Sequence, residues 1–118
     1  MQNKRSLGTE KEELAITYLE EHGATILAKN FFFRGGELDL VAKDGEYVCF
    51  IEVKYRKSLS YGYPEEAVTL SKQKKIMQGA KVFLYQNHYS SDTPCRFDVI
   101  SIYKENINWI KDAFVLYT

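Results

Sequence analysis

The chain has 118 residues, of which 45% are hydrophobic, 27% charged and 14% aromatic, a composition typical of one folded globular domain. Its formal net charge is zero, which argues against a protein that coats nucleic acid without regard to sequence, because such proteins are strongly basic. No apolar run approaches the roughly 20 residues of a membrane-spanning helix, and no apolar stretch follows the basic N-terminus as in a secretory signal. We therefore expect a single domain over residues 1–118, located in the cytoplasm and without a membrane partner.

The cysteines and histidines indicate neither a disulfide framework nor a zinc site. Cys49 and Cys95 each lie in an apolar strand pattern, which favours buried free thiols over a bridge. His22 and His88 are far from each other in the sequence, and with only two cysteines no zinc-ligand spacing exists.

The first third of the chain predicts a helix and then a strand. Thr9 and Glu12 have the spacing of a capping box, which would open an amphipathic helix. Gly23 would end that helix by supplying a left-handed cap. Residues 24–33 are rich in β-branched and aromatic side chains and predict a strand, which residues 34–36 interrupt.

Residues 37–55 predict a β-hairpin around Asp44-Gly45, a pair that suits a two-residue type I′ turn. With this turn, Asp39 would lie opposite Phe50, and side chains would alternate between the two faces of the hairpin. One face is then wholly apolar and is expected to be core: Leu38, Leu40, Ala42, Tyr47, Cys49, Ile51 and Val53. The other face carries Val41, Val48 and Phe50 near the turn, and Glu37, Asp39, Glu52 and Lys54 at its open end.

The second half of the chain predicts a loop, a helix and two strands. Residues 57–64 have loop composition, and 71–86 show helical periodicity with one apolar face, made of Ile76, Met77, Ala80, Phe83 and Leu84. Residues 95–103 and 107–111 predict strands, separated by a turn at 104–106. The resulting order is helix, three strands, helix, two strands, which is an α/β domain.

The acids at the open end of the hairpin predict a metal site. Neighbouring carboxylates repel one another and are costly to desolvate unless a cation neutralises them. Asp39 and Glu52, with Glu37 as a further candidate, offer the hard oxygen ligands that suit Mg²⁺ or Mn²⁺, and the backbone carbonyl of Val53 could add another. A metal there would activate water toward a phosphodiester, and Lys54 could orient that water or stabilise the developing charge. The alternative is an ordinary solvated strand face with weak ion pairs.

These residues resemble the PD-(D/E)XK restriction-endonuclease superfamily, which includes the archaeal Holliday-junction resolvases, although no proline precedes the first acid. Over nearly its full length, the chain more closely resembles the bacterial YraN-like family of uncharacterised proteins. The matching segments are Glu12-x-x-Ala15-x-x-Tyr18-Leu19, Asn30, Arg34-Gly35-Gly36-Glu37-Leu38-Asp39-Leu40, Glu52-Val53-Lys54-Tyr55-Arg56, Ser71-Lys72-Gln73 and Arg96-Phe97-Asp98-Val99.

The resemblance implies a restriction-endonuclease-like core, in which helices pack on a central mixed sheet of about five strands. It also implies metal ligation by Asp39 and Glu52, with Lys54 as the catalytic lysine. It implies no demonstrated reaction, because the YraN-like family has none assigned.

Several further residues each have a functional and a structural interpretation. Glu12 could reach the site as a helical glutamate does in the resolvases, although its capping role is a sufficient explanation. Lys72 and Gln73 could hold a phosphate at a helix N-terminus or be a solvated helix end. Arg34 and Arg56 flank the acids and could bind phosphates or form ordinary basic surface.

The remaining candidates also have a structural interpretation beside a functional one. Lys57 could bind phosphate, and Tyr61 and Tyr63 could stack on bases or pack against a partner subunit. Arg96 and Asp98 share a strand face and are expected to form a structural ion pair or to support the site indirectly, and Trp109 is expected in the core.

The leading hypothesis is a metal-dependent nuclease acting on DNA, which we favour over RNA, and in particular on branched or structured DNA. A branched substrate would call for a homodimer, because two strands must be cut. The alternative is a nucleic-acid-binding module without catalytic activity. A protein-interaction domain with no nucleic-acid role rests only on the abundance of aromatic residues.

Overall fold

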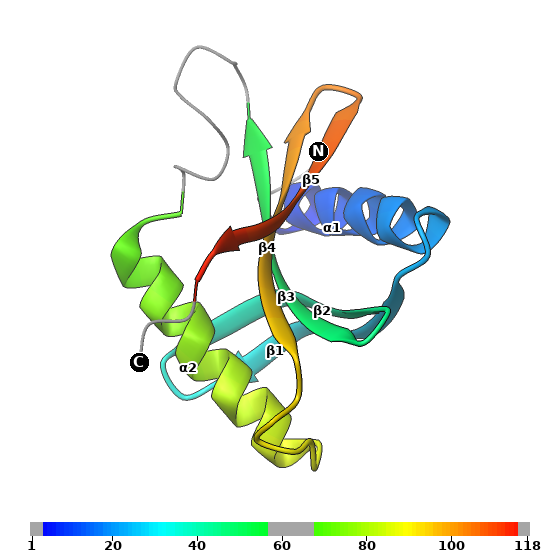
Figure 1. Cartoon of the computed structure of the whole chain (residues 1–118). Coiled ribbons are helices and arrows are strands. Elements are labelled where there is room, and N and C mark those ends of the chain that lie inside the picture. The colour runs from blue at the N-terminus through cyan, green and yellow to red at the C-terminus, as the bar shows by residue number, and fades with distance from the viewer. Residues whose placement is uncertain (1–3, 57–67, 116–118) are drawn as a thin grey trace.

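The computed structural model describes residues 4–56 and 68–115, with the backbone alone for residues 4–9. The elements are α1 (Lys4–Glu21), β1 (Thr25–Phe33), β2 (Gly36–Asp44), β3 (Tyr47–Arg56), α2 (Leu70–Gln86), β4 (Cys95–Tyr103) and β5 (Asn106–Phe114) (Figure 1). The element order and the mixed sheet confirm the α/β class expected from the sequence. The predicted loop at 57–64, with Lys57, Tyr61 and Tyr63, lies outside the described residues.

The five strands form one sheet in the order β1-β2-β3-β4-β5, and only β3 and β4 are parallel. The connection between those two parallel strands contains α2, as parallel neighbours require a crossover. Neither described helix has the length and apolar character needed to cross a membrane.

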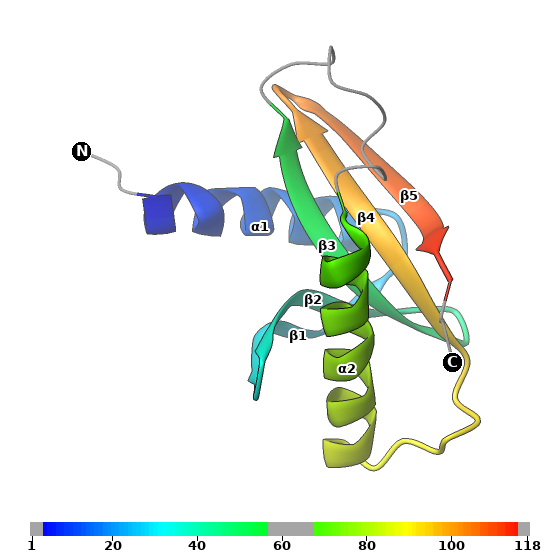
Figure 2. The same cartoon turned by 90° about the vertical axis from the view of Figure 1, so that its left-hand side faces the viewer.

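Each helix covers one face of the sheet and defines a separate hydrophobic cluster (Figure 2). The cluster under α1 contains Ala15 and Leu19 of the helix and Leu40, Ala42, Cys49, Ile51, Ile100 and Ile102 of the sheet. The cluster under α2 contains Ile76, Met77, Ala80 and Phe83 of the helix and Val41, Val48, Phe50, Phe97 and Val99 of the sheet. Burial on both faces explains why the middle strands read as nearly continuous apolar runs.

The predicted start of the first helix is wrong, whereas its predicted end is confirmed. The helix begins at Lys4, so Thr9 lies within it and does not cap it. The Ser/Thr-x-x-Glu pattern can also occur inside a helix. Here residues 4–8, which precede Thr9, are helical as well. At the other end, Gly23 has φ +91°, and the Ala24 amide donates to the Leu19 carbonyl at 2.9 Å, the bond of a Schellman cap.

The turn between β2 and β3 contains Gly45 and Glu46, not the predicted Asp44 and Gly45. Asp44 pairs with Tyr47, and Gly45 has φ +59° at the first central position, the feature of a type II′ turn. The predicted pairing of Asp39 with Phe50 is therefore wrong, since Phe50 lies opposite Val41. Because the partner moves by two residues and not by one, each β3 side chain keeps its predicted face.

The predicted ion pair between Arg96 and Asp98 is confirmed and forms part of a buried network. The fully buried Asp98 carboxylate accepts bonds from the Arg96 guanidinium at 2.9 Å, from the Trp109 indole N–H at 2.9 Å and from the Asp112 amide at 2.9 Å. Arg96 also contacts Asp44 at 2.8 Å. Trp109 packs against the α1 cluster but is only half-buried, so the prediction that it lies in the core is confirmed only in part.

The two cysteines are free, as the sequence predicts. Cys49 is buried, and its burial raises the pKa of its thiol to about 12. Cys95 is only half-buried, because it lies at the beginning of β4.

Helix α2 approaches the sheet closely at Gly79. A Cβ atom at this position would lie 2.5 Å from Cε1 of Phe33 and 2.9 Å from Cδ2 of Leu38. A glycine at position 79 therefore allows α2 to pack closely against the β1–β2 hairpin.

We expect Gly79→Ala to lower the free energy of unfolding by roughly 1 kcal/mol, because the overpacking cost exceeds the gain of about 1 kcal/mol in helix propensity. Urea unfolding would measure this change. The adjacent exposed Gln78→Ala is the control and should stay within about 0.5 kcal/mol of wild type. A Gly79→Ala protein as stable as the control would contradict the close approach.

Candidate metal centre

The candidate site lies where β2 and β3 separate. Their pairing extends from Asp44 opposite Tyr47 only as far as Leu40 opposite Ile51. Beyond that point, β3 continues to Arg56 beside β4, while β2 curves away together with β1 (Figure 2). We call the opening between residues 36–39 of β2 and residues 52–56 of β3 the fork.

The side-chain alternation of β2 changes at the fork, which the sequence did not predict. Leu38 packs in the α2 cluster, whereas Leu40 packs in the α1 cluster, although strict alternation would put both on one face. Opposite them on β1, Asn30 has φ +52°, and Lys29 and Asn30 both contact glutamates of α1. The prediction that Leu38 and Leu40 share one apolar face is therefore wrong. The prediction assumed that side chains alternate strictly along the strand, and a local backbone irregularity breaks that alternation.

The Asp39 carboxylate bridges the fork. Its Oδ2 accepts a hydrogen bond of 2.9 Å from the Val53 amide. The carboxylate thus takes the place of the backbone carbonyl that a paired neighbouring strand would offer to this amide. The N–H and C=O of one strand residue point toward the same neighbour. The Val53 carbonyl consequently faces the fork too, as its predicted role as a metal ligand requires.

Glu52 is the buried acid of the site, with only 5% of its surface exposed. Burial, together with the nearby Asp39 carboxylate, raises its pKa to about 7, against the opposing effect of Lys72 and Lys54. The amino groups of Lys54 and Lys72 each lie 3.7 Å from the same oxygen, Oε1 of Glu52. At neutral pH the carboxyl is therefore protonated part of the time in the absence of a metal, and a bound cation would favour its ionised form.

A second group of acids lies beside Asp39 on the α1 side. One carboxylate oxygen each from Glu12, Glu37 and Asp39 lie within 4.8 Å of one another, and all three side chains are half-buried. Burial raises the pKa of Glu37, and the charges of Asp39 and Glu12 raise it further. Asp39 belongs to this group and also lies near Glu52, whereas Glu52 is not itself a member of the group.

The structure brings together the central residues predicted from the sequence, which are Asp39, Glu52, Lys54, Glu37 and the Val53 carbonyl. Their arrangement differs from the expected flat patch on one sheet face. Glu52 and Lys54 come from the β3 side of the fork, and Glu37 and Asp39 come from the β2 side.

The residues predicted to flank the site have different outcomes. Lys72 reaches Glu52, and Glu12 reaches the acids from the middle of α1, where it has no capping role. The Gln73 side chain donates to the Val68 carbonyl at 3.0 Å, and its phosphate-binding role stays a prediction. Arg34 lies in the exposed turn between β1 and β2, and Arg56 is half-buried at the end of β3.

Two supporting contacts were not identified from the sequence. Asn30 donates a 2.9 Å hydrogen bond from Nδ2 to Oε2 of Glu12, and so holds that carboxylate at the site. The Lys11 amino group lies 3.5 Å from the centre of the Tyr55 ring and joins α1 to the part of β3 that β2 has left. The sequence did contain one indication of the irregularity in β1. Asn30 lies within a run of apolar and aromatic residues, and asparagine tolerates positive φ better than most residues.

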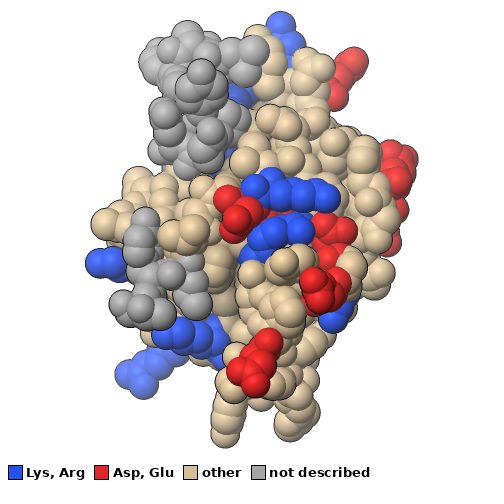
Figure 3. Space-filling view, in the orientation of Figure 1, with Lys and Arg blue, Asp and Glu red and all other residues tan. Residues whose placement is uncertain are grey.

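The charges elsewhere do not form an extended basic surface on the face seen in Figure 3. Lysine, arginine and acidic side chains lie next to one another there in a central patch. Asp44 contacts Arg96 at 2.8 Å and Lys111 at 3.1 Å. Arg96 and Lys111 therefore already have an acidic partner in Asp44, which does not favour a phosphate-binding role for these two cations.

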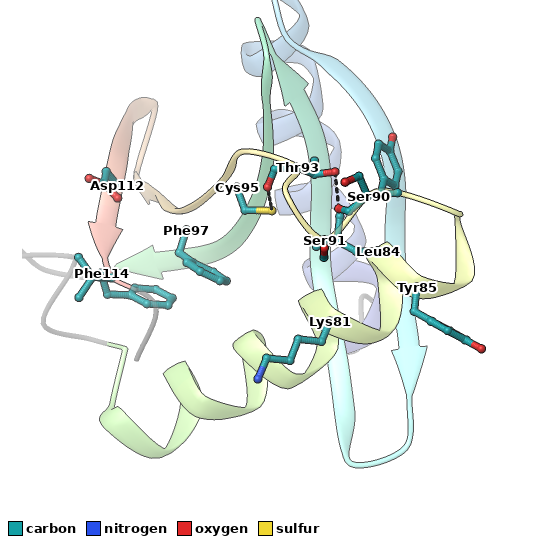
Figure 4. Close-up of a pocket in the computed structure, with 12 residues that line it drawn as sticks. Lys81, Leu84, Tyr85, Ser90, Ser91, Thr93, Cys95, Phe97, Asp112 and Phe114 are labelled. Atoms are coloured by element: carbon teal, nitrogen blue, oxygen red, sulfur yellow. Dashed lines mark hydrogen bonds between the residues drawn. The ribbon is translucent and has the colours of Figure 1, made fainter. Parts of the chain in front are cut away.

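A cavity of about 590 Å³ lies apart from the fork, between the end of α2, the connection to β4 and the end of β5 (Figure 4). Its lining includes Leu84, Phe97 and Phe114, with Lys81 and Asp112 among the polar residues. It shares no lining residue with the fork. The titratable groups of the candidate metal centre therefore do not face this cavity.

Comparisons with known proteins agree with the resemblance seen in the sequence. The model of a family described as "Uncharacterised protein family UPF0102" matches residues 11–102. The chain is 48% identical over 115 residues to a UPF0102 protein of Lachnoclostridium phytofermentans, an alignment covering 98% of both chains. It is 41% identical over 116 residues to a UPF0102 protein of Saccharophagus degradans, again covering 98% of both. With a UPF0102 protein of Aliivibrio fischeri it shares 44% identity over 117 residues, which cover 97% of this chain and 95% of the relative.

The raised pKa of Glu52 predicts a pH-dependent stability in metal-free buffer. A carboxyl whose folded pKa exceeds its unfolded pKa stabilises the fold below the unfolded value, near 4.5, and loses that contribution as pH rises through about 7. Glu52→Gln cannot ionise, so from pH 4.5 to 8 its stability should rise relative to wild type by about 3 kcal/mol.

Urea unfolding with a chelator at both pH values would measure this difference. Glu46→Gln, the same substitution in the exposed β2–β3 turn, controls for the loss of a surface carboxylate. A stability difference between Glu52→Gln and wild type that does not change with pH would contradict the burial of an ionisable Glu52.

Proposed function

The chain belongs to the uncharacterised protein family UPF0102, and we propose that it is a cytoplasmic nuclease that uses Mg²⁺ or Mn²⁺ to hydrolyse phosphodiester bonds in DNA. The observation that carries this proposal is the convergence, at one fork of the sheet, of a buried glutamate, a bridging aspartate and two lysines. The preference for DNA, and for branched or structured DNA cut by a homodimer, rests on the resemblance to the PD-(D/E)XK superfamily.

The donor groups at the fork suit a hard divalent cation. Asp39, Glu52 and the Val53 carbonyl would hold it, and Glu37 and Glu12 lie close enough to Asp39 to contribute. All of these ligands are oxygens, and the site contains no histidine or thiolate that would favour a softer metal. When bound, the metal would supply Lewis-acid polarisation of the phosphodiester and activation of a water molecule.

The two lysines have distinct proposed roles because they come from different elements. Lys54 follows Glu52 on the same strand and would stabilise negative charge on the reacting phosphate. Lys72 lies in the first turn of α2, and its own backbone amide donates to the side chain of the N-cap residue Thr69 at 3.1 Å. It would bind a phosphate of the DNA backbone. Arg34 and Arg56, at the two ends of the fork, would extend this backbone contact.

One observation favours the second candidate, a nucleic-acid-binding module without catalytic activity. The Glu52 carboxylate has two lysine partners in the protein itself, so its charge is compensated without a metal. A module of this kind would bind through Lys72 and its neighbours, and substitution of Glu52 would have little effect on that binding.

The proposal is tested by incubating wild type, Glu52→Gln and Glu46→Gln with labelled four-way junction, flap, duplex and single-stranded DNA, first with Mn²⁺ and then with Mg²⁺. We expect wild type and the exposed control Glu46→Gln to cleave, and Glu52→Gln to lose at least about a hundredfold in rate. The absence of cleavage by wild type, with equal binding by all three proteins, would overturn the nuclease and favour the binding module.

The separate roles of the lysines give a further expectation. Lys54→Ala should lower the cleavage rate by roughly 100-fold with little change in DNA affinity, because it acts on charge that develops during reaction. Lys72→Ala should instead weaken binding and reduce its dependence on salt concentration, because it removes one phosphate contact. Single-turnover cleavage and salt-dependent binding measurements would separate them, and identical effects of both substitutions would contradict this assignment.

A further inference from the structure

A large aromatic side chain is exposed at the edge of the fork. Phe32, near the end of β1, has 72% of its surface exposed to solvent. Its neighbours in the sequence are both packed against α2: Phe31 makes an edge contact with Phe83, and Phe33 lies against Gly79. Phe32 is therefore exposed although both of its neighbours pack against α2, and it is the most exposed large hydrophobic side chain of β1, where Leu27 is 37% exposed.

The sheet register places Phe32 directly beside the acids. Phe32 is the β1 partner of Glu37, and directly opposed residues of an antiparallel pair share one face, with Cβ atoms about 5 Å apart. Glu37 belongs to the acidic group with Asp39 and Glu12. Asn30, two residues before Phe32, contacts Glu12 and so lies on the same side. The exposed ring is thus next to the candidate metal centre on the side from which α1 reaches it.

We propose that Phe32 is a stacking platform for an unpaired base of the nucleic acid whose phosphate lies at the fork. The proposal rests on the proposed function and makes its substrate more specific: single-stranded DNA, or a branch or flap at which a base is unstacked. An exposed aromatic face binds any base without regard to sequence, whereas the bases of an intact duplex are already stacked on one another.

The structure holds this platform in place. Phe31 and Phe33 anchor the β1–β2 hairpin to α2 on both sides of Phe32, with the ring centres of Phe31 and Phe83 5.3 Å apart. Little backbone ordering would therefore be needed when a base stacks, and this preorganisation favours binding. Arg34 follows in the exposed turn and could contact the phosphate of the stacked nucleotide.

The test measures binding of an oligonucleotide containing the fluorescent base 2-aminopurine, with Ca²⁺ as the divalent cation, in single-stranded form and within a blunt duplex. We expect wild type to quench the single-stranded probe. Phe32→Ala should bind it roughly tenfold more weakly and lose the quenching, while duplex affinity stays unchanged. Phe32→Trp should restore both signals because it retains an aromatic face, whereas Phe32→Leu should not.

Controls separate the competing explanations. Tyr85→Ala removes another highly exposed aromatic ring, at the opposite end of α2 from Lys72, and should bind like wild type. Sedimentation of Phe32→Ala tests whether the ring instead contacts a second copy of the chain, and a change in oligomeric state would overturn the inference. Strong single-strand binding that is equal in wild type and Phe32→Ala would overturn it while leaving the nuclease proposal intact. No nucleic-acid binding by wild type would overturn both.

Discussion

The hydrogen bond from the Val53 amide to the Asp39 carboxylate joins two strands where they cease to be neighbours. Without a partner, the Val53 amide would be an unsatisfied donor in a half-buried part of the sheet, which costs free energy. The carboxylate satisfies it, and the strands can then separate far enough for side chains to converge between them. The position of Glu52, the direction of the Val53 carbonyl and the nearness of Glu37 all depend on this separation.

The charges around the fork support the proposed cation site. Glu52 is almost fully buried, and two lysine amino groups lie at equal distances from one of its oxygens. Asp39 adds negative charge from the other strand, and this charge, together with burial, raises the pKa values of Glu37 and Glu52. A divalent cation would relieve this repulsion and release the lysines toward a phosphate, so cation and substrate binding are expected to assist each other.

Much of the fold followed from local patterns, because the helices and strands have clear periodicity and strong turn residues. The gathering of Asp39, Glu52 and Lys54 was predicted although the hairpin register was wrong, since the error of two residues preserved the faces of β3. The sequence did not reveal the change of alternation between Leu38 and Leu40 of β2, or the positive φ of Asn30 on the neighbouring strand β1. It also left Glu12 ambiguous, because contacts distant in sequence cannot be read from spacing.

The central claim is that Asp39 and Glu52 form a divalent-cation site, and calorimetric titration with Mn²⁺ at pH 7.5 tests it most directly. Wild type should bind Mn²⁺, and both Asp39→Asn and Glu52→Gln should bind it at least about tenfold more weakly while remaining folded. Asp92→Asn, the same change on an exposed residue of the connection to β4, should bind like wild type. Mn²⁺ affinity that is the same in all four proteins, or absent from wild type, would contradict the claim.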